Sequence, residues 1–229
     1  MRLRASILTA LMTCAQAQAT NLAVSPLRLD LDSQHAIGAL TITNQGDSDI
    51  VVQTDVQHWQ QSGNEDHFDT ASGLMITPAL FRLRPGSHQI IRVGWRQLPA
   101  PGPATSTYRL FLSEVPTSTG GNSSGLRMGL RLSLPLFMHW PNERPMQLTW
   151  HQAPAVGDQP GTLMLSNPGG QPARITRILL NGDQALPDQL IYVLPGNRYS
   201  LGIPAGLGII HQVRAVGDDG PLPIAPTAP

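Results

Sequence analysis

Cysteine is nearly absent from this sequence. The single cysteine among 229 residues, Cys14, lies in an N-terminal segment that we expect to be removed. A chain without thiols holds no disulfide framework, no zinc thiolate site and no cysteine nucleophile. Charged residues are also sparse, at 13%, and the formal net charge is +0. The sequence therefore carries no broad basic field for nucleic acid, and we expect no nucleic-acid partner.

The N-terminal segment predicts export. It has a basic start with Arg2 and Arg4, a short and mostly apolar stretch at residues 7–12, and a small-residue cleavage site at residues 17–19. The apolar stretch falls well short of the ~20 residues that span a bilayer, which argues against a membrane anchor. We therefore expect residues 1–19 to be a cleaved signal peptide.

Helical periodicity is also lacking. The chain contains 21 Pro and 22 Gly, and no window keeps an apolar period of 3.6 residues over several turns. Strand-type alternation recurs instead between turn signals, which is the spacing typical of a β-sandwich. The sequence therefore predicts an all-β protein. The clearest alternating segments lie at residues 27–31, 39–44, 50–56 and 89–95.

A short proline-flanked segment divides the pattern. Pro141 and Pro145 enclose polar residues, which suits a short, stiff hinge. Beyond it, short strands and turns begin again. We therefore predict an N-terminal domain at residues 20–141 and a smaller C-terminal β-sandwich at residues 142–229.

The longest alternation lies just before this hinge. Every second residue is apolar, so one face of the predicted strand is almost pure leucine, while the other face carries arginine, glycine, serine and proline. Any half-buried strand shows such alternation. The pattern alone therefore leaves two interpretations, a core strand or an exposed strand donated to a partner. The apolar residues are Leu126, Met128, Leu130, Leu132, Leu134 and Leu136.

Enzyme motifs are weak. Residues 121–125 formally fit the G-x-S-x-G nucleophile motif, but they lie in a soft loop before a strand, not on a strand-to-helix turn. The histidines are not spaced as metal ligands, and no phosphate loop or dinucleotide fingerprint is present. We therefore expect no catalysis, no cofactor and no metal.

A set of short motifs runs along nearly the whole mature chain. They are Val24–Leu29, Leu40–Asn44, Arg82–Gly86, Ile91–Val93, Tyr108–Leu110, Glu114–Pro116, Leu134–Phe137, Leu165–Pro168 and Asp218–Gly220. Their joint order and spacing resemble those of the PapD-like family of periplasmic pilus chaperones, although no single motif is specific. The form of residues 131–137 looks more like the archaic or spore-coat-type branch than the type 1 and P pilus branch.

The resemblance implies two immunoglobulin-like domains in a boomerang arrangement and a periplasmic location. Such chaperones bind, fold and cap pilus subunits, and deliver them to an outer-membrane usher. The subunits lack the last strand of their fold, and the last strand of the chaperone's N-terminal domain fills the gap, which is donor-strand complementation. We therefore predict donation by Leu126, Met128 and Leu130, whereas Leu132 and Leu134 are candidates that also suit the chaperone's own core.

Two other outcomes stay open. The free protein is a candidate for a self-capping oligomer that hides the leucine face. The alternative from another class is a secreted adhesion or structural protein of two immunoglobulin-like domains, in which the leucine strand is simply core.

The resemblance also implies two basic residues that anchor the subunit's C-terminal carboxylate. Arg28 occupies the position of the first, and its planar fork suits two charge-assisted hydrogen bonds to a carboxylate. The position of the second, lysine in many relatives, is Pro135, which cannot bind a carboxylate. Arg131, on the same strand face, is our first candidate to replace it. Arg92, at an arginine position typical of the family, is the second.

A salt-bridge network between the domains, also implied by the resemblance, is only partly present. Asp218 matches the acid that this network has in the C-terminal domain. His139 occupies the position of the network's arginine, and Thr105 occupies the position of its glutamate in the N-terminal domain. His139 is either an ordinary histidine of the hinge surface or a residue in contact with Asp218. A contact with Asp218 would tighten in mild acid, because an unperturbed histidine is mostly neutral at neutral pH.

Overall fold

The computed structural model describes residues 22–116, 129–153, 161–204 and 206–227. The elements in these ranges are all strands, which confirms the all-β prediction. No helix among the described residues is long and apolar enough to cross a membrane. The predicted signal peptide, the motif at residues 121–125, Leu126 and Met128 lie outside the described residues.

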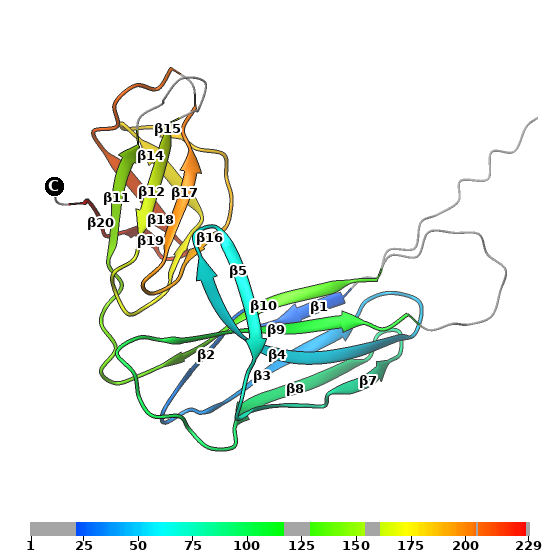
Figure 1. Cartoon of the computed structure of the whole chain (residues 1–229). Coiled ribbons are helices and arrows are strands. Elements are labelled where there is room, and N and C mark those ends of the chain that lie inside the picture. The colour runs from blue at the N-terminus through cyan, green and yellow to red at the C-terminus, as the bar shows by residue number, and fades with distance from the viewer. Residues whose placement is uncertain (1–21, 117–128, 154–160, 205, 228–229) are drawn as a thin grey trace, which may run out of the picture.

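Two domains meet at an angle, as Figure 1 shows. The N-terminal domain is a sandwich of two sheets, and strand alternation sets which side chains enter it. The first sheet has the order β1-β3-β8-β6, with antiparallel neighbours. Its strands are β1 (Leu22–Ser25), β3 (Ile37–Asn44), β6 (Leu74–Thr77) and β8 (His88–Trp95).

The second sheet of this domain has the order β2-β10-β9-β4-β5, and β7 pairs with β4. The chain crosses from the first sheet to the second between β1 and β2, so residues 26–28 bridge one edge of the sandwich. The strands are β2 (Leu29–Asp32), β4 (Ile50–Ser62), β5 (Glu65–Thr70), β7 (Leu80–Leu83), β9 (Ser106–Glu114) and β10 (Arg131–His139).

The C-terminal domain has its own sheets, in the orders β17-β12-β11-β20, β13-β16 and β15-β14-β18-β19. Its buried core is separate from that of the N-terminal domain. The N-terminal core uses residues from Leu29 to Trp140, and the C-terminal core begins at Leu148. The predicted boundary after residue 141 lies in the segment between them. The strands are β11 (Leu148–Ala153), β12 (Thr162–Ser166), β13 (Ala173–Ile175), β14 (Arg177–Leu180), β15 (Gln184–Ala185), β16 (Ile191–Val193), β17 (Arg198–Gly202), β18 (Val213–Gly217), β19 (Gly220–Leu222) and β20 (Ile224–Pro226).

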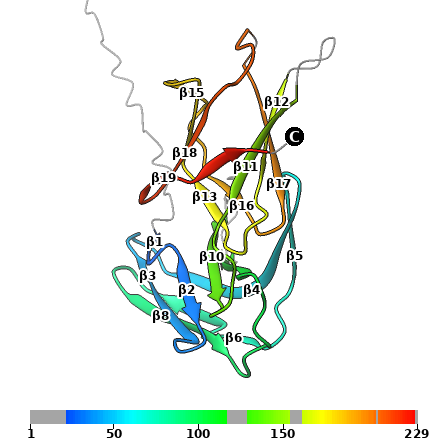
Figure 2. The same cartoon turned by 90° about the vertical axis from the view of Figure 1, so that its left-hand side faces the viewer.

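The β4–β5 hairpin braces the C-terminal domain. Its tip lies beside that domain in both views (Figures 1 and 2). The amide of Gln61 accepts a hydrogen bond from the Leu194 N–H at 2.9 Å and donates one to the Tyr192 carbonyl at 3.0 Å. Asn64 forms the same kind of pair with the backbone of Ser200, at 2.7 Å in each direction. These contacts are between neutral groups, so they hold the two domains together without a titratable side chain.

The hinge side is closely packed as well. The Thr105 N–H donates to the Gly170 carbonyl at 2.8 Å, and the Gly170 N–H donates to the Arg144 carbonyl at 3.1 Å. A Cβ on Gly170 would lie 2.5 Å from the Pro103 carbonyl oxygen, closer than any side chain tolerates. Glycine is therefore required here because two backbones approach without room for a side chain.

Candidate functional site: the cleft between the domains

A cleft of about 610 Å³ opens beside the junction of the domains. Leu27 and Leu190, from opposite domains, line it and are 66% and 56% exposed. Three cationic side chains and three carboxylates are also in its lining, so the cleft offers both apolar contact and charge. The charged residues are Arg28, Asp30, Arg109, Arg174, Asp218 and Asp219.

Arg28 lies in this cleft. It sits on the crossing from β1 to β2, where the chain leaves one sheet for the other. Its Nε donates to Asp30 Oδ2 at 2.6 Å. Asp30 points outward because its strand neighbours Leu29 and Leu31 are buried in the core. The crossing therefore supplies a cation, and β2 supplies its carboxylate partner two residues later.

Arg109 is the cation that sequence reasoning missed. In the register of β9 and β10 it lies directly opposite Pro135, the position that the resemblance assigns to the second basic residue. Its guanidinium carbon is 3.8 Å from the centre of the Trp59 ring and 5.2 Å from that of Tyr192, which holds it by cation–π contact. Burial lowers the pKa of Arg109 because the charged form is partly desolvated.

The Nε of Arg109 is buried, and among the described residues it has no hydrogen-bond partner. An unpaired donor on a buried cation is costly. Arg109 stands in the Tyr108-Arg109-Leu110 motif, so its face was predictable from alternation. Its position opposite Pro135 was not, because that depends on a register across a long connection.

The two replacements predicted for the basic residue at Pro135 have other surroundings. Arg131 lies on the same face of β10, but it is exposed and stacks over Phe111 at 4.2 Å, outside the cleft lining. Arg92 also lies outside the cleft lining. It lies on β8 of the other sheet, and points outward because Ile91 and Val93 fill the core. Strand alternation and sheet assignment thus separate Arg92 from Arg28.

The leucine face of β10 is divided between core and partly exposed positions. Leu134 and Leu136 are buried in the N-terminal core, at 8% and 0% exposure. Of the two interpretations of Leu134, this burial favours a place in the chaperone's own core. Leu132 is partly buried and packs against the core. Leu130 precedes the strand and is partly exposed.

One edge of β10 is closed over only half its length. β9 pairs with it from Arg131 to Met138, but β2 pairs with the other edge only from Leu136 onward. Among the described residues, no strand covers that edge before Leu136. The Leu130 carbonyl accepts from the Glu114 N–H at 2.8 Å, so alternate backbone groups, those of even-numbered residues, face β9. Arg131 and Ser133 then direct their backbone groups to the open edge.

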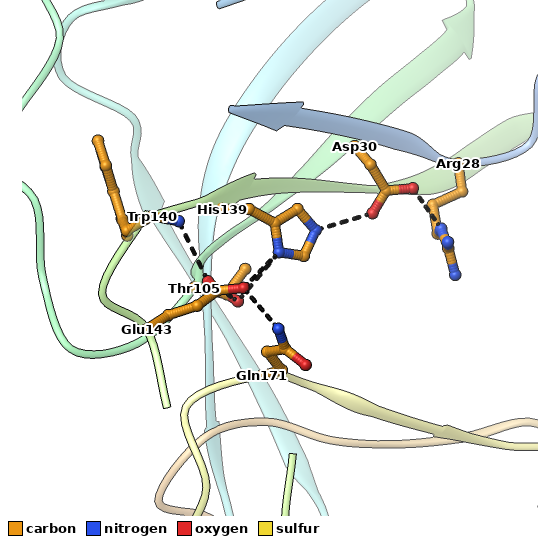
Figure 3. A network of polar contacts seen from close by, with 7 residues as sticks. All are labelled: Arg28, Asp30, Thr105, His139, Trp140, Glu143 and Gln171. Atoms are coloured by element: carbon orange, nitrogen blue, oxygen red, sulfur yellow. Dashed lines mark hydrogen bonds and ion pairs between the residues drawn. The ribbon is translucent and has the colours of Figure 1, made fainter. Parts of the chain in front are cut away.

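A polar network crosses the hinge (Figure 3). The Nε2 of His139 is 3.1 Å from Asp30 Oδ1, and its Nδ1 is 2.9 Å from Glu143 Oε1. Asp218 instead forms an ion pair with Arg174. The alternative that places His139 in contact with Asp218 is therefore wrong, because two nearer carboxylates occupy both ring nitrogens.

Glu143 supplies the carboxylate for which the resemblance implies a glutamate at the position of Thr105. Thr105 Oγ1 donates to Glu143 Oε2 at 2.7 Å, and Gln171 of the C-terminal domain donates to Oε1 at 2.8 Å. Sequence reasoning treated Glu143 only as part of the hinge. The signal that marked it was its i+4 spacing from His139, which brings the two together where the chain turns.

These contacts shift the acidity of the network. The hydrogen bond to Asp30 raises the pKa of His139, against burial, and the Glu143 contact adds to the rise. Burial alone would raise the pKa of Asp30 and of Glu143. For both acids, hydrogen bonds outweigh burial and lower the pKa. Asp30 accepts them from His139 and Arg28. Glu143 accepts them from Thr105, His139 and Gln171. The network thus favours two carboxylates with an imidazolium between them.

Comparison with known proteins assigns the fold to a family. Residues 21–144 match the model of the pili and flagellar-assembly chaperones, PapD N-terminal domain. The chain belongs to this chaperone family. Chaperone protein FaeE of Escherichia coli is 26% identical over 230 residues, which cover 94% of this chain and 81% of that protein. Membership in the chaperone family favours a chaperone over a secreted adhesion or structural protein.

Solved structures share the chaperone fold. A complex of CsuC with the tip adhesion subunit CsuE, from archaic chaperone-usher Csu pili of Acinetobacter baumannii, gives a TM-score of 0.74 at 19% identity and covers 91% of this chain and 100% of the solved one. The Salmonella enterica SafA pilin in complex with the SafB chaperone gives 0.67 at 17% identity and covers 90% and 94%. The predicted resemblance to two-domain pilus chaperones is confirmed.

Proposed function

We propose that this protein binds, folds and caps pilus subunits by donor-strand complementation and passes them to an outer-membrane usher. The observation that carries the proposal is the open edge of β10 before Leu136. An unpaired row of N–H and C=O groups is a template for another strand. Leu130 and Leu132 flank this edge with apolar side chains that the domain buries only in part.

The donated face extends, in this proposal, to Leu126 and Met128. Burying a large aliphatic side chain contributes ~1.5–3 kcal/mol relative to leaving it exposed, so several together can offset an incomplete subunit core. Leu134 is excluded from this role because the chaperone's own core uses it.

The subunit's C-terminal carboxylate is proposed to bind Arg28 and Arg109. Both line the cleft, and Arg109 lies opposite Pro135 on the strand next to the donor edge. Arg28 is already bonded to Asp30, whereas the Arg109 Nε has no partner among the described residues. The carboxylate would pair with the positive charge of Arg109 and share Arg28 with Asp30.

A periplasmic location follows as part of the proposal, from the predicted signal peptide at residues 1–19 and from membership in a pilus chaperone family. Catalysis has no part in it. Among the described residues, no group of three or more potential ligands is placed to hold a metal ion.

Co-purification tests the proposed function. The full chain is expressed with an affinity tag in a pilus-forming bacterium, isolated from the periplasm, and its bound proteins are identified by mass spectrometry. We expect pilus subunits in stoichiometric amounts. A chaperone recovered alone, under conditions in which pili assemble, would overturn the proposal.

The anchor is tested in the same assay with Arg109→Gln. We expect a strong loss of recovered complex and a smaller loss for Arg109→Lys, which keeps the charge without the planar fork. Arg92→Gln is the matched control, because Arg92 is exposed on the other sheet. Equal recovery for Arg109→Gln and Arg92→Gln would remove Arg109 from the anchor.

A further inference from the structure

One carboxylate in the cleft is shared by two cations. Asp30 Oδ2 accepts from the Arg28 Nε at 2.6 Å, and Asp30 Oδ1 lies 3.1 Å from His139 Nε2 (Figure 3). The two oxygens of Asp30 therefore serve a residue of the cleft and a residue of the hinge at once. Any change in one cation alters how strongly Asp30 binds the other.

The ring of His139 is held between two carboxylates. Besides Asp30 at Nε2, Glu143 Oε1 lies 2.9 Å from Nδ1. A carboxylate accepts hydrogen bonds, so each ring nitrogen must donate to make both contacts. Only the doubly protonated imidazolium has two N–H groups. The geometry by itself therefore selects the charged form of His139.

The far end of the network reaches the C-terminal domain. The Glu143 side chain is only 7% exposed and accepts hydrogen bonds from Thr105 and from Gln171. Gln171 belongs to the C-terminal domain, between β12 and β13. Arg28, Asp30, His139, Glu143 and Gln171 thus form an unbroken chain of contacts from the cleft to the other side of the hinge.

We propose that Asp30 and His139 are positioning residues that link the availability of Arg28 for a carboxylate ligand to the protonation of His139 and to the hinge. This inference rests on the proposed function, since the ligand is the C-terminal carboxylate of a subunit. Protonated His139 takes part of the charge of Asp30, which leaves Arg28 freer to bind an incoming carboxylate.

Linkage fixes the direction of the effect. If protonation of His139 strengthens carboxylate binding at Arg28, carboxylate binding must raise the pKa of His139 by the same coupling. Capture of a subunit would then strengthen the contacts of His139 with Asp30 and Glu143, and so tighten the hinge. As pH rises through the already raised pKa of His139, capture should weaken.

Other charged groups also face this region. The two hollows that include His139 are lined by Arg28, Asp30, Asp32, Arg174, Asp218 and Asp219. Arg174 forms an ion pair with Asp218, and Asp32 contacts His35. Of these groups, Asp30 is the one that hydrogen-bonds to both Arg28 and His139. The linkage therefore depends on Asp30, and its removal should abolish it.

The first experiment needs no subunit. The ring nitrogens of His139 are titrated by NMR in the full mature chain and in two variants. We expect Arg28→Gln to raise the pKa of His139, because Asp30 is then no longer shared, and Asp30→Asn to lower it. Arg82→Gln is the control, since it removes a similarly exposed arginine–aspartate pair, with Asp49, at another site. An unchanged pKa in Arg28→Gln would overturn the inference.

The second experiment measures recovery of the subunit complex from pH 5.5 to 8.5, using the subunits identified by co-purification. The parent protein should lose complex several-fold as pH rises, whereas His139→Arg should keep the acid-side recovery throughout. His139→Gln should stay at the alkaline level. A His139→Gln variant with the parent's pH profile would overturn the linkage. Failure to recover any subunit with the parent would instead count against the proposed function, and the NMR titration would still decide the inference.

Discussion

The two halves of β10 share one apolar face, formed by the even-numbered residues, but have different surroundings. The half from Leu136 to His139 lies between β2 and β9, and its even-numbered side chains fill the core. The half from Arg131 to Pro135 has β9 on one edge and no described strand on the other. One strand thus begins as an edge and ends as an interior strand of the same sheet.

The change coincides with Pro135. Its nitrogen carries no hydrogen, and by the alternation of the ladder that nitrogen would face the open edge. Proline is tolerated there because β9 loses no hydrogen bond, as at other edge positions. The difference between the halves teaches that a strand's availability to a partner depends on which edge is covered, and not on its hydrophobic pattern.

The largest expected effect is in the closed half. Leu136→Ala removes a side chain with 0% exposure from the N-terminal core and should lower the free energy of unfolding by ~2–5 kcal/mol. Urea unfolding followed by tryptophan fluorescence measures it. The fraction that remains folded should still bind subunits, because this half offers no free edge. A loss below ~1 kcal/mol would mean that the closed half is not packed as described.

His139, the last residue of the closed half, should make the free energy of unfolding depend on pH. The pKa of His139 is raised above its ordinary 6.5, so its contribution is complete below about pH 6.5 and is lost as pH rises through the raised value. Asp30 and Glu143 have lowered pKa values, so their contributions are present above 3.8 and 4.5 and are lost as pH falls through the lowered values.

The free energy of unfolding should therefore be highest between pH 4.5 and 6.5. Urea unfolding across this range measures the profile. His139→Gln is the control, and should remove the decline on the alkaline side. A parent profile that rises from pH 6.5 to 8.5 would contradict the contacts of His139.

The sequence predicts the fold, but it predicts only part of the difference between the two halves of β10. Alternation and turn signals predict the strands because side-chain burial follows a period of two. The same period cannot say that Leu134 is core and Leu130 is not, since both lie on one face. Arg28 was placed by the family pattern. Arg109 was missed because it meets Pro135 through strand register, which the local sequence does not encode. Glu143 was missed although its i+4 spacing from His139 marked it, because its contact with Gln171 depends on hinge packing.

Proline substitutions should distinguish the two edges of the open half by a smaller effect on the free energy of unfolding. Ser133→Pro removes an N–H that faces the open edge, so it should change the free energy of unfolding by less than ~1 kcal/mol yet reduce recovery of the subunit complex. Leu132→Pro is the matched control, because its N–H belongs to the ladder with β9. It should destabilise the domain far more. Equal destabilisation by both substitutions would mean that the edge before Pro135 is not open.

The smallest effect on stability is expected at Leu130. This residue precedes β10, is partly exposed and stands outside the core cluster, so Leu130→Ala should change the free energy of unfolding by only ~0.5 kcal/mol. Its effect on subunit capture should be large, because a donated side chain contributes its burial only in the complex. Urea unfolding and co-purification of the same preparation measure both quantities, with Leu134→Ala as the opposite case on the same face. A Leu130→Ala protein that is strongly destabilised but captures subunits normally would make this leucine a core residue, and the donated-strand mechanism would fail with it.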